Sequence, residues 1–492
     1  MTAQGRLCIG GEWIEGAGGA FTSHNPADGS PLWEGRAASP AQVADAVAAA
    51  RAAFRDWRRV PLDERIAILE RYAALVEERR EELARAIAEE TGKPLWDARG
   101  EAGAMAAKVR ISIAAHEERT PTRRREKGAI VQHLTHRPHG VMAVFGPFNF
   151  PGHLPNGHIV PALLAGNTIV FKPSELTPRV AELLVRLLME AGVPEGVVNL
   201  VHGGREVGAA LLDQAVDGVL FTGSREAGLA IHRHFAGRPE VILALEMGGN
   251  NPLIVWDAAD AQAAALLIVQ SAFITTGQRC TCARRLILPE GAAGDGVLDA
   301  LVALAERLRV DRFDAEPEPF MGPLISEAAA LRLLDAVKAR IAAGARAILP
   351  LARLLDKGPA FVTPAILDVT GVPVPDGELF GPVLQVIRVA DFDAALEAAN
   401  DTMFGLAAGL ISDDEGLFRR FAEEIAAGVI AWNRPTAGAS SELPFGGIKQ
   451  SGNHRPSAWY AADYCAWPQA GLSAAAGRPV RPAELPPGIA AD

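Results

Sequence analysis

The sequence predicts an α/β protein built from two doubly wound parallel sheets. Across residues 141–221, short apolar runs alternate with longer stretches of helical periodicity, a pattern typical of parallel sheets with helices on both faces. The same alternation starts again after Glu246. The chain has 492 residues, which is too long for one hydrophobic core, so we expect two or three domains.

Each predicted strand is a short apolar run bounded by turn residues. The first run alternates apolar with small or polar residues, as expected for a strand with one covered face. The predicted strands comprise residues 8–13, 129–136, 141–145, 168–171, 197–201, 218–221, 253–255, 285–288 and 383–389.

The predicted helices have apolar residues at helical spacing and recognisable starts. Ser39 and Thr177 are each followed by proline, a pair typical of an N-cap and a first helical position. The predicted helices comprise residues 40–57, 61–91 (ending before Gly92), 94–116, a stretch after Pro155, 178–191, a stretch after Ser224, 260–276, 295–307, 327–343 and 391–399. Residues 471–492, rich in alanine and proline, are expected to be extended or loose.

The charge distribution argues against nucleic acid or an anionic membrane as the main partner. The formal net charge is −11, and the longest basic run is the three arginines from Arg123 to Arg125. A small anionic substrate is compatible with this charge, because a pocket can be locally basic.

The chain is expected to work in a reducing cytoplasm. Its first residues lack the apolar segment of a secretory signal. The most apolar window, residues 258–274, is interrupted by Asp260, Gln262 and Gln270, so it predicts a core helix rather than a membrane span. Four cysteines in so long a chain do not make a disulfide framework, and a reducing compartment would keep a catalytic thiol free.

Two residues suggest a thiol nucleophile and a carboxylate base. Glu246 begins the run Glu-Met-Gly-Gly, and Cys280, 34 residues later, ends the run Gly-Gln-Arg-Cys. A thiolate is the strongest side-chain nucleophile and needs a locally electropositive, partly open setting. A carboxylate with a raised pKa can take a proton from water in a hydrolytic second step, and Gly248 would let a flat group approach. On these residues alone, a buried cysteine and a solvated glutamate remain an open alternative.

The two runs resemble the signature motifs of the aldehyde dehydrogenase superfamily, and similar segments extend from about Gly10 to Tyr464. The resemblance implies a Rossmann-type NAD-binding domain, a second α/β catalytic domain and a small oligomerisation element that makes a homodimer or homotetramer. The implied NAD-binding domain comprises residues 1–122 and 141–245, the catalytic domain residues 246–447, and the oligomerisation element with the C-terminal tail residues 123–140 and 448–492.

The chain lacks the common Gly-x-Gly-x-x-Gly dinucleotide fingerprint. Instead, Gly223, Ser224 and Gly228 lie where an apolar strand passes into a helix, a context that can hold a diphosphate over the helix N-terminus. From the residues alone, a plain strand-to-helix turn is an equal alternative. The family resemblance implies that this segment binds the pyrophosphate of NAD.

Two further pairs of residues are candidates for the riboses of the cofactor. Lys172 and Glu175 end a strand and could hold a ribose diol or form a surface ion pair; the resemblance implies the adenosine ribose. A carboxylate accepts from a 2′-hydroxyl and repels a 2′-phosphate, so Glu175 favours NAD over NADP. Glu378 and Phe380 resemble the motif beside the nicotinamide, although alone they could be a loop glutamate and a core phenylalanine.

Asn149 is the candidate for stabilising charge on the aldehyde oxygen. The run Pro-Phe-Asn-Phe-Pro around it matches the oxyanion motif of the family. A neutral amide can stabilise that charge without neutralising the thiolate, and the resemblance implies the backbone N–H of Cys280 as the second donor. An isolated asparagine in such a setting would otherwise be a turn residue.

Residues 149–158, 432–439 and 451–457 resemble one branch of the superfamily, whose substrate is the 5-semialdehyde of N-succinylglutamate in arginine degradation. That small molecule carries two carboxylates, so the pocket should offer cationic donors. Arg434 and Arg455 are the candidates for substrate binding, because arginine pairs with carboxylates bidentately. Packing against the sheet or against a neighbouring subunit is an equal alternative for both.

No metal site is expected. Cys280 and Cys282 form a Cys-x-Cys run, but no second pair of ligands is present. His153 and His158 have Pro155 and Gly157 between them, so they should not share a regular helix face, and a satisfied loop or core position is favoured over ligation.

The resemblance implies a complete reaction path. Cys280 attacks the aldehyde, Asn149 holds the oxyanion, a hydride passes to NAD, and Glu246 activates the water that hydrolyses the thioester. Three alternatives remain: a CoA-acylating enzyme, whose branch lacks the glutamate found here at Glu246; a dehydrogenase for another semialdehyde or aliphatic aldehyde; and a non-catalytic protein on the same scaffold. The joint presence of Cys280, Glu246, Asn149 and Lys172 argues against the last.

Overall fold

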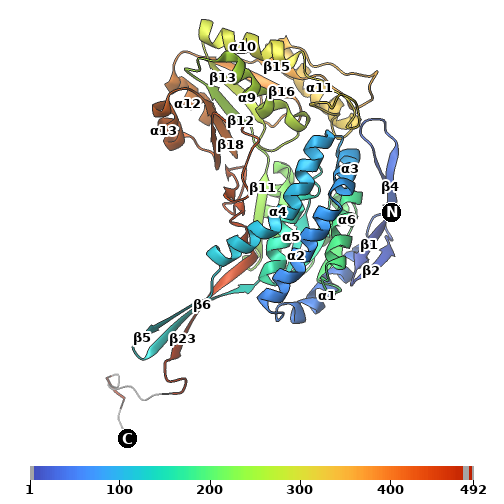
Figure 1. The fold of residues 1–492 in the computed structure, drawn as a ribbon, viewed down its shortest axis with the longest axis vertical. Helices are drawn as coiled ribbons and strands as arrows, with labels where there is room; N and C mark the ends of the chain where they lie inside the picture. Colours follow the sequence, from blue (N-terminus) through green and yellow to red (C-terminus); the bar gives the residue numbers. More distant parts are fainter. Residues whose placement is uncertain (1–4, 480–486, 490–492) are drawn as a thin grey trace.

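The computed structural model describes residues 5–479 and 487–489. Two α/β bodies lie one above the other, and a narrow arm projects from the lower body (Figure 1). Each body is built on a seven-stranded sheet, and the arm contains a three-stranded sheet. The predicted α/β class with two sheets is confirmed.

The first sheet has the strand order β11-β10-β7-β8-β9-β1-β2. Its strands are β1 (Arg6–Ile9), β2 (Glu12–Glu15), β7 (Val141–Phe145), β8 (Thr168–Lys172), β9 (Val198–Leu200), β10 (Gly218–Gly223) and β11 (Ile242–Met247). The strands from β7 to β11 are parallel, whereas β1 and β2 are antiparallel additions at one edge. The chain builds outward from β7 in both directions, so a ligand crevice is expected between the carboxyl ends of β7 and β10.

Helices cover both faces of this sheet. They are α1 (Pro40–Trp57), α2 (Leu62–Glu78), α3 (Arg80–Thr91), α4 (Leu95–Arg119), α5 (His153–Ala165), α6 (Pro178–Glu190), α7 (Arg205–Leu212), α8 (Arg225–His234) and α14 (Ala461–Cys465). Alternate residues of β7 point to opposite faces: Val141 and Ala143 share a core with α1, α7 and α8, whereas Met142 and Val144 share one with α2 to α6. Burial on both faces explains why this strand is continuously apolar.

The second sheet has the order β14-β15-β16-β13-β12-β18-β19, with only β14 antiparallel to its neighbour. Its strands are β12 (Asn251–Val255), β13 (Ala283–Pro289), β14 (Arg346–Leu349), β15 (Ala365–Asp368), β16 (Val383–Val389), β18 (Ala407–Ile411) and β19 (Val429–Trp432). Its helices are α9 (Ala261–Phe273), the short 3-10 helix η1 (Ile274–Gly277), α10 (Ala292–Ala305), α11 (Glu327–Ala342), α12 (Phe392–Asn400) and α13 (Glu415–Glu424). The core with α9 and α10 lies on one face, and the core with α12 and α13 lies on the other.

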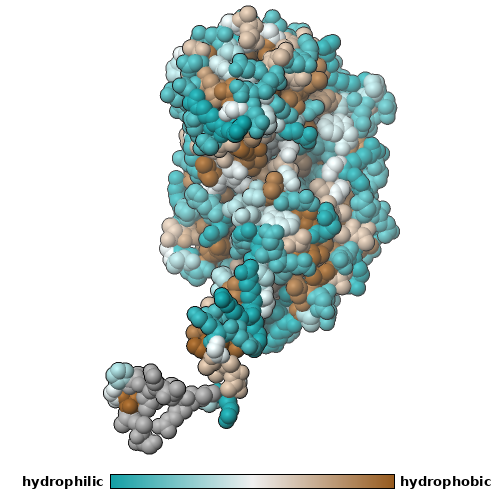
Figure 2. All heavy atoms as spheres, turned by 60° about the vertical axis from the view of Figure 1, so that its left-hand side comes forward, coloured by the Kyte–Doolittle hydropathy of each residue, from teal (hydrophilic) through white to brown (hydrophobic). Residues whose placement is uncertain are grey.

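The arm is an antiparallel sheet of β5 (Arg123–Lys127), β6 (Ile130–Pro138) and β23 (Ala466–Ala474). It carries exposed apolar side chains, with Trp467 41%, Ile130 47% and Leu472 74% exposed, among hydrophilic ones (Figure 2). Within the predicted C-terminal element, residues 448–465 pack on the body that contains the first sheet, since α14 lies in the core of that body. Residues 480–486 and 490–492 of the tail that was expected to be loose lie outside the described residues.

Three short two-stranded sheets complete the fold. They pair β3 (Ala20–His24) with β4 (Pro31–Arg36), β17 (Phe404–Gly405) with β21 (Ile448–Lys449), and β20 (Pro444–Phe445) with β22 (Ser457–Ala458). No helix of the described residues is both long enough and apolar enough to cross a membrane.

Several predicted elements differ in detail from the structure. The single strand predicted over residues 8–13 is wrong: β1 and β2 form a hairpin, because Gly10 (φ 62°) and Gly11 (φ 91°) make a tight left-handed turn. The helix predicted over residues 61–91 breaks at Arg79, whose guanidinium pairs with Glu190 of α6 at 2.7 Å. The break has no glycine or proline signal in the sequence.

Helix starts were predicted with mixed success. Ser39 accepts from the backbone N–H of Gln42 in a capping box, as expected. Thr177 occupies the N-cap position of α6 but makes no capping hydrogen bond. Helix α5 starts at His153, so Pro155 falls in its first turn, where a missing backbone N–H costs nothing.

Candidate active site

Two cavities meet at the predicted nucleophile and base. A cavity of about 400 Å³ lies between α4, α5 and the loop around Ala439. A second cavity of about 650 Å³ lies at the carboxyl ends of β7 and β10, where the strand order of the first sheet predicts a crevice. The residues that line both cavities are Leu154, Thr222, Glu246, Cys280 and Phe445. A reacting carbon at Cys280 is therefore reachable from both sides.

The loop that carries Cys280 has a constrained backbone. Thr275 (φ 54°), Thr276 (φ 56°) and Gly277 (φ 68°) all lie in the left-handed region just before it. A Cβ on Gly277 would lie 2.2 Å from the carbonyl oxygen of Gly381, so only glycine fits there. On the other side, the Asn251 side chain donates to the carbonyl of Cys280 at 2.7 Å. The thiol is thus presented from a fixed position.

The two neighbouring cysteines differ in access. Cys280 is partly exposed and lines both cavities, whereas Cys282 is fully buried and lines neither. The expected electropositive setting of the nucleophile is not found. Burial raises the pKa of the Cys280 thiol to about 12, and the carboxylates of Glu378 and Glu246 add to the shift, while Arg284 opposes it. The thiol therefore needs a base to become a nucleophile.

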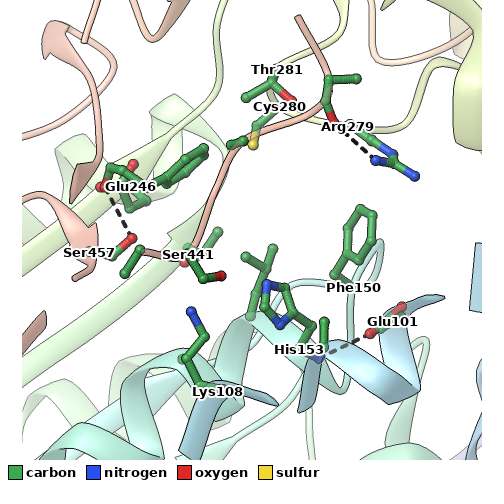
Figure 3. Close-up of a pocket in the computed structure, with 18 of the residues that line it drawn as sticks. Glu101, Lys108, Phe150, His153, Glu246, Arg279, Cys280, Thr281, Ser441 and Ser457 are labelled. Carbon is green, nitrogen blue, oxygen red and sulfur yellow. Dashed lines mark hydrogen bonds between the residues drawn. The ribbon is translucent and has the colours of Figure 1, made fainter. Parts of the chain in front are cut away.

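Glu246 lies near the end of β11 and faces the cavities beside Cys280 (Figure 3). It is 5% exposed, and its Oε2 atom is buried without a hydrogen-bond partner among the described residues. Burial raises its pKa well above the ordinary value, which makes it a stronger base than a solvated carboxylate. A Cβ on Gly446 would lie 2.8 Å from Glu246 Oε1, so this glycine leaves room for the carboxylate.

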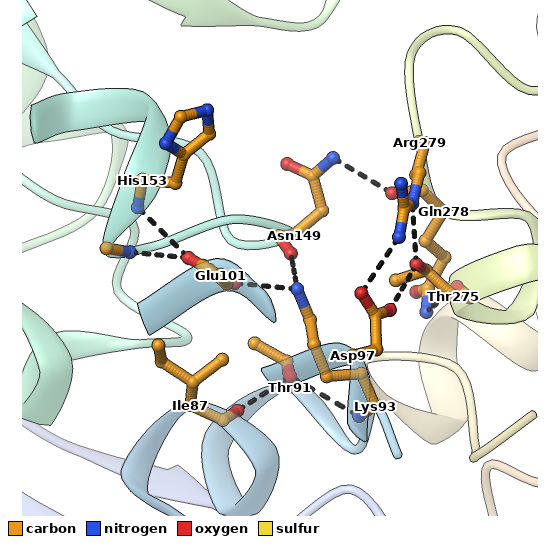
Figure 4. A network of polar contacts seen from close by, with 11 residues as sticks. Ile87, Thr91, Lys93, Asp97, Glu101, Asn149, His153, Thr275, Gln278 and Arg279 are labelled. Carbon is orange, nitrogen blue, oxygen red and sulfur yellow. Dashed lines mark hydrogen bonds and ion pairs between the residues drawn. The ribbon is translucent and has the colours of Figure 1, made fainter. Parts of the chain in front are cut away.

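Asn149 and Cys280 each keep one N–H donor available. The Asn149 side chain is buried and donates one N–H to the carbonyl of Gln278 at 2.8 Å (Figure 4). An amide NH₂ has a second hydrogen, which this bond leaves available. The backbone N–H of Cys280 has no acceptor in the part of the chain that the structure describes.

A buried ion pair anchors the loop of Asn149. The Lys93 ammonium donates to Glu101 Oε2 and to the Asn149 carbonyl, both at 2.7 Å. The second oxygen of Glu101 accepts from the backbone N–H groups of Gly152 at 2.9 Å and His153 at 3.1 Å. Both charged side chains are almost completely buried, at 1% and 0% exposed. The pair therefore fixes the backbone on both sides of the predicted oxyanion loop.

A second ion pair anchors the loop of Cys280. Arg279 donates to Asp97 Oδ1 at 2.8 Å and to the Thr275 hydroxyl at 2.8 Å. The Thr275 hydroxyl in turn donates to Asp97 Oδ2 at 2.5 Å. Asp97 and Glu101 are four residues apart on α4, so one helix face holds both loops (Figure 4).

The second cavity brings together most of the predicted cofactor residues. Lys172, Glu175, Gly223, Ser224, Gly248, Glu378 and Phe380 all line it. The Lys172 ammonium lies 4.0 Å from Glu175 and donates to the carbonyl of Gly203 at 2.7 Å. Burial lowers its pKa to about 8. Ser224 is the N-cap of α8, where its hydroxyl accepts from the backbone N–H of Ala227 and keeps its own hydrogen to donate.

The predicted glycines have different roles. A Cβ on Gly248 would lie 2.0 Å from Glu378 Oε2, so this glycine leaves space in the cavity wall. Gly228 does not line the cavity: a Cβ there would lie 2.4 Å from the Met247 sulfur, so it permits close packing of α8 on β11. The expectation that Gly228 contacts a cofactor directly therefore has no support in this geometry.

Glu378 and Phe380 form the far wall of the second cavity. Arg284 is fully buried and donates to Glu378 Oε1 at 3.1 Å. Burial raises the pKa of Glu378 to about 7, although this cation opposes the shift. The Phe380 ring packs edge-on against Phe148 of the oxyanion loop, with ring centres 5.8 Å apart.

The predicted substrate arginines lie away from both cavities. Arg434 and Arg455 are exposed, and neither lines a cavity wall. The cationic residues that line the first cavity are Lys108 and Arg279. The two arginines were predicted because arginine pairs bidentately with carboxylates. In the structure, their loops turn both side chains toward solvent.

Comparison with known proteins identifies the family. The model of the aldehyde dehydrogenase family matches residues 13–468. The chain belongs to this family. The N-succinylglutamate 5-semialdehyde dehydrogenase of Chromobacterium violaceum is 55% identical over 98% of this chain and 99% of its own length. N-succinylglutamate 5-semialdehyde dehydrogenase 2 of Caulobacter vibrioides is 57% identical over 96% of each chain. The crystal structure of an NAD-dependent aldehyde dehydrogenase from Sinorhizobium meliloti superposes with a TM-score of 0.92 at 30% identity, covering 98% of this chain and 96% of that one.

Histidines beside this aldehyde dehydrogenase site do not form a metal centre. His158 is hydrogen-bonded through both ring nitrogens, to Tyr464 at 2.8 Å and Thr222 at 3.2 Å. The Nδ1 of His153 is buried without a partner among the described residues, although both histidines lie on α5. No group of three or more potential ligands in the described part of the chain is arranged to hold a metal.

Sequence reasoning missed the residues that support the aldehyde dehydrogenase loops. Asp97 and Glu101 lie on a helix whose polar residues look like an ordinary solvated face. Their spacing of four, with Lys108 seven residues further, was a usable signal, because it places all three on one helical stripe. Gly446 and Arg284 stand in segments that carry no local indication of their contacts.

We expect Glu101→Gln to destabilise the protein by about 3 kcal/mol or more, because Lys93 then remains buried without a counter-charge. The unfolding temperature should fall, and turnover should fall because the Asn149 loop loses an anchor. Glu81→Gln is a matched control, since Glu81 is 59% exposed beside Arg99 and should contribute at most about 1 kcal/mol. The double variant Lys93→Met/Glu101→Gln should recover part of the loss; strictly additive losses would contradict the coupling.

Proposed function

We propose that this protein is an NAD-dependent aldehyde dehydrogenase that oxidises N-succinyl-L-glutamate 5-semialdehyde to N-succinyl-L-glutamate in arginine catabolism. The observation that carries the proposal is the meeting of two cavities at Cys280 and Glu246. The second cavity suits the cofactor, and the first cavity suits the aldehyde. The name of the relative from Chromobacterium violaceum, which is 55% identical over nearly the whole chain, supports this substrate.

The second cavity fits NAD by the chemistry of its walls. Lys172 and Glu175 would hold the adenosine ribose, the N-terminus of α8 with Ser224 would hold the diphosphate, and Glu378 would hold the other ribose. The bound cofactor supplies a positively charged nicotinamide ring that accepts a hydride. Glu175 accepts from a ribose hydroxyl and repels a 2′-phosphate, so NAD is favoured over NADP.

The residues near the meeting point of the two cavities carry out the other steps of the reaction. Glu246, with its raised pKa, accepts the proton of the Cys280 thiol, and the sulfur adds to the aldehyde carbon. The side chain of Asn149 and the backbone N–H of Cys280 donate to the oxygen as negative charge develops. Loss of a hydride from that carbon leaves a thioester on Cys280. Glu246 releases the thiol proton to solvent and then takes a proton from water, the hydroxide oxygen adds to the acyl carbon, and the sulfur leaves as a thiolate while the carboxylic acid forms.

We also propose a homo-oligomer, a dimer or tetramer, that works in the cytoplasm. The arm supports the first point, because β5 and β23 are unpaired edge strands beside the exposed side chains of Trp467 and Leu472. The free thiols of the chain support the second, because a nucleophilic cysteine needs a reducing compartment. Light scattering on the purified protein measures the number of subunits.

The activity is tested by incubating the protein with NAD and a panel of aldehydes, with and without CoA, while NADH absorbance is followed. We expect NADH formation that does not depend on CoA and is fastest with N-succinylglutamate semialdehyde. NADP should support a lower rate. Dependence on CoA would indicate an acylating enzyme, a different best aldehyde would reject the substrate, and absence of NADH with every aldehyde would reject catalysis.

Cys280→Ala should abolish NADH formation, whereas Cys282→Ala should keep most of it. The reason is access: Cys280 lines both cavities, and Cys282 is fully buried outside them. Initial rates are compared after confirming that both variants keep the unfolding temperature of the wild type. Equal loss in the two variants would reject Cys280 as the sole nucleophile.

Glu246→Gln should give a slower burst of NADH, because Cys280 loses the group that takes its proton. The burst should stop at about one equivalent per active site, because the water that hydrolyses the thioester also loses its base. Rapid mixing with NAD and aldehyde measures the burst, and mass spectrometry of the quenched protein should find the acyl group on Cys280. A variant that binds NAD but produces no burst would place the essential proton transfer before hydride loss.

A further inference from the structure

Helix α4 presents a stripe of charged side chains to the first cavity. Asp97, Glu101 and Lys108 all line it, and their spacing places them on one side of the helix. Asp97 is paired with Arg279, and Glu101 is paired with Lys93. Lys108 is the member of the stripe that has no ion pair and no hydrogen bond within the described residues.

Lys108 is a buried residue whose side chain lies beside α5. The residue is 3% exposed, and its ammonium points toward the interior of the cavity (Figure 3). A Cβ on Gly157 of α5 would lie 3.8 Å from Lys108 Cε and 4.0 Å from Nζ, so the side chain runs past this glycine. An amine in so enclosed a place without a counter-charge is costly, which a structural role alone does not explain.

The groups around Lys108 do not neutralise it. Burial, followed by the positive charge of Lys108, lowers the pKa of His153 to about 3 and that of His158 to about 4, so both imidazoles are neutral at physiological pH. The hydroxyl groups of Ser440 and Ser441 line the same cavity. Of the acidic residues in this wall, Asp97 and Glu101 are already paired, and Glu246 lies beside the nucleophile. The cavity therefore presents one uncompensated positive charge.

In Figure 3, Cys280 and Lys108 lie at opposite sides of the cavity. We propose that Lys108 binds a carboxylate of the aldehyde substrate and thereby selects aldehydes that carry a negative charge remote from the reacting carbon. The proposal rests on the proposed aldehyde oxidation, and it names the residue that reads the substrate. Ser440, Ser441 and His153 can add neutral hydrogen bonds to the same carboxylate.

The test compares pairs of aldehydes that differ only in charge: N-succinylglutamate semialdehyde with its diamide, and succinate semialdehyde with its amide. Lys108→Met removes the ammonium and keeps the length of the side chain. We expect kcat/KM for the carboxylate member of at least one pair to fall roughly ten- to hundredfold, mainly through KM. The amide of that pair should change much less, because it offers no charge to the lysine.

Two further measurements separate recognition from support of the fold. Lys108→Arg should restore most of the preference for the charged aldehyde, because it restores the positive charge. In the wild type, burial lowers the pKa of Lys108 to about 8, so the ammonium is present below this pH and is lost above it. The ratio of kcat/KM for the charged aldehyde to that for its amide should therefore fall above about pH 8. Lys108→Arg should not show this fall, since arginine stays protonated.

The ratio isolates Lys108 from the other titrating groups. Cys280 and Glu246 act on both aldehydes of a pair, and the imidazoles of His153 and His158 are neutral throughout this range. Lys338→Met is a matched control, because Lys338 is 75% exposed on α11. Arg434→Leu and Arg455→Leu test the residues predicted from the sequence, and neither should alter the preference.

The outcomes distinguish this proposal from the proposed function. If the wild type oxidises succinate semialdehyde but not N-succinylglutamate semialdehyde, the specific substrate is wrong, and Lys108 is still tested on the shorter pair. Equal losses on the charged and uncharged members in Lys108→Met would make the residue a support of the fold and overturn the proposal. Unchanged kinetics in Lys108→Met, or a lost preference in Arg434→Leu, would place carboxylate binding elsewhere and overturn it as well.

Discussion

The arrangement of the active site depends on two ion pairs that α4 makes with the loops above it. Lys93–Glu101 holds the backbone on both sides of Asn149, and Asp97–Arg279 holds the left-handed segment before Cys280. Buried ion pairs contribute little net stability, because desolvation offsets their attraction. Their effect here is on position. The proposed oxyanion donor and the proposed nucleophile come from loops of different sheets, and one helix holds both loops in fixed relative positions.

The path of the chain explains why Glu246, the proposed base, lies where the two cavities meet. Glu246 is near the end of β11, an edge strand of the first sheet, and only three residues separate Met247 from Asn251, where the second sheet begins. Backbone hydrogen bonds from Met247 to Ser451 and from Leu245 to the Asn453 side chain tie the returning C-terminal segment to the same strand. The carboxylate is thus enclosed by both bodies, and this burial raises its pKa.

Residues in contiguous motifs were predictable, and residues that act through tertiary contacts were not. Cys280, Glu246, Asn149 and Glu378 each stand beside glycine, proline or aromatic residues that mark a loop of special shape, so local reading found them. Lys108 belongs to a segment with ordinary helical composition, and Lys93 stands in a short turn between two helices. The importance of both arises only when α4 packs beneath the cavity. The break at Arg79 was missed as well, because no glycine or proline marks it.

The contrast between Lys108 and the two arginines shows why residue type alone is a poor guide to charge recognition. Arg434 and Arg455 have the better geometry for a carboxylate, but exposed guanidinium groups are screened by water and contribute little selectivity. The Lys108 ammonium is a weaker hydrogen-bond donor to a carboxylate than a guanidinium, but its charge is screened less. The surrounding protein has a low effective dielectric, and the other charged residues of the α4 stripe are already paired. The Lys108 side chain is already largely desolvated in the free protein. A single unpaired cation there can therefore distinguish a charged aldehyde from a neutral one. The same burial that raises the pKa of Cys280 and of Glu246 thus makes one lysine sufficient to read the substrate.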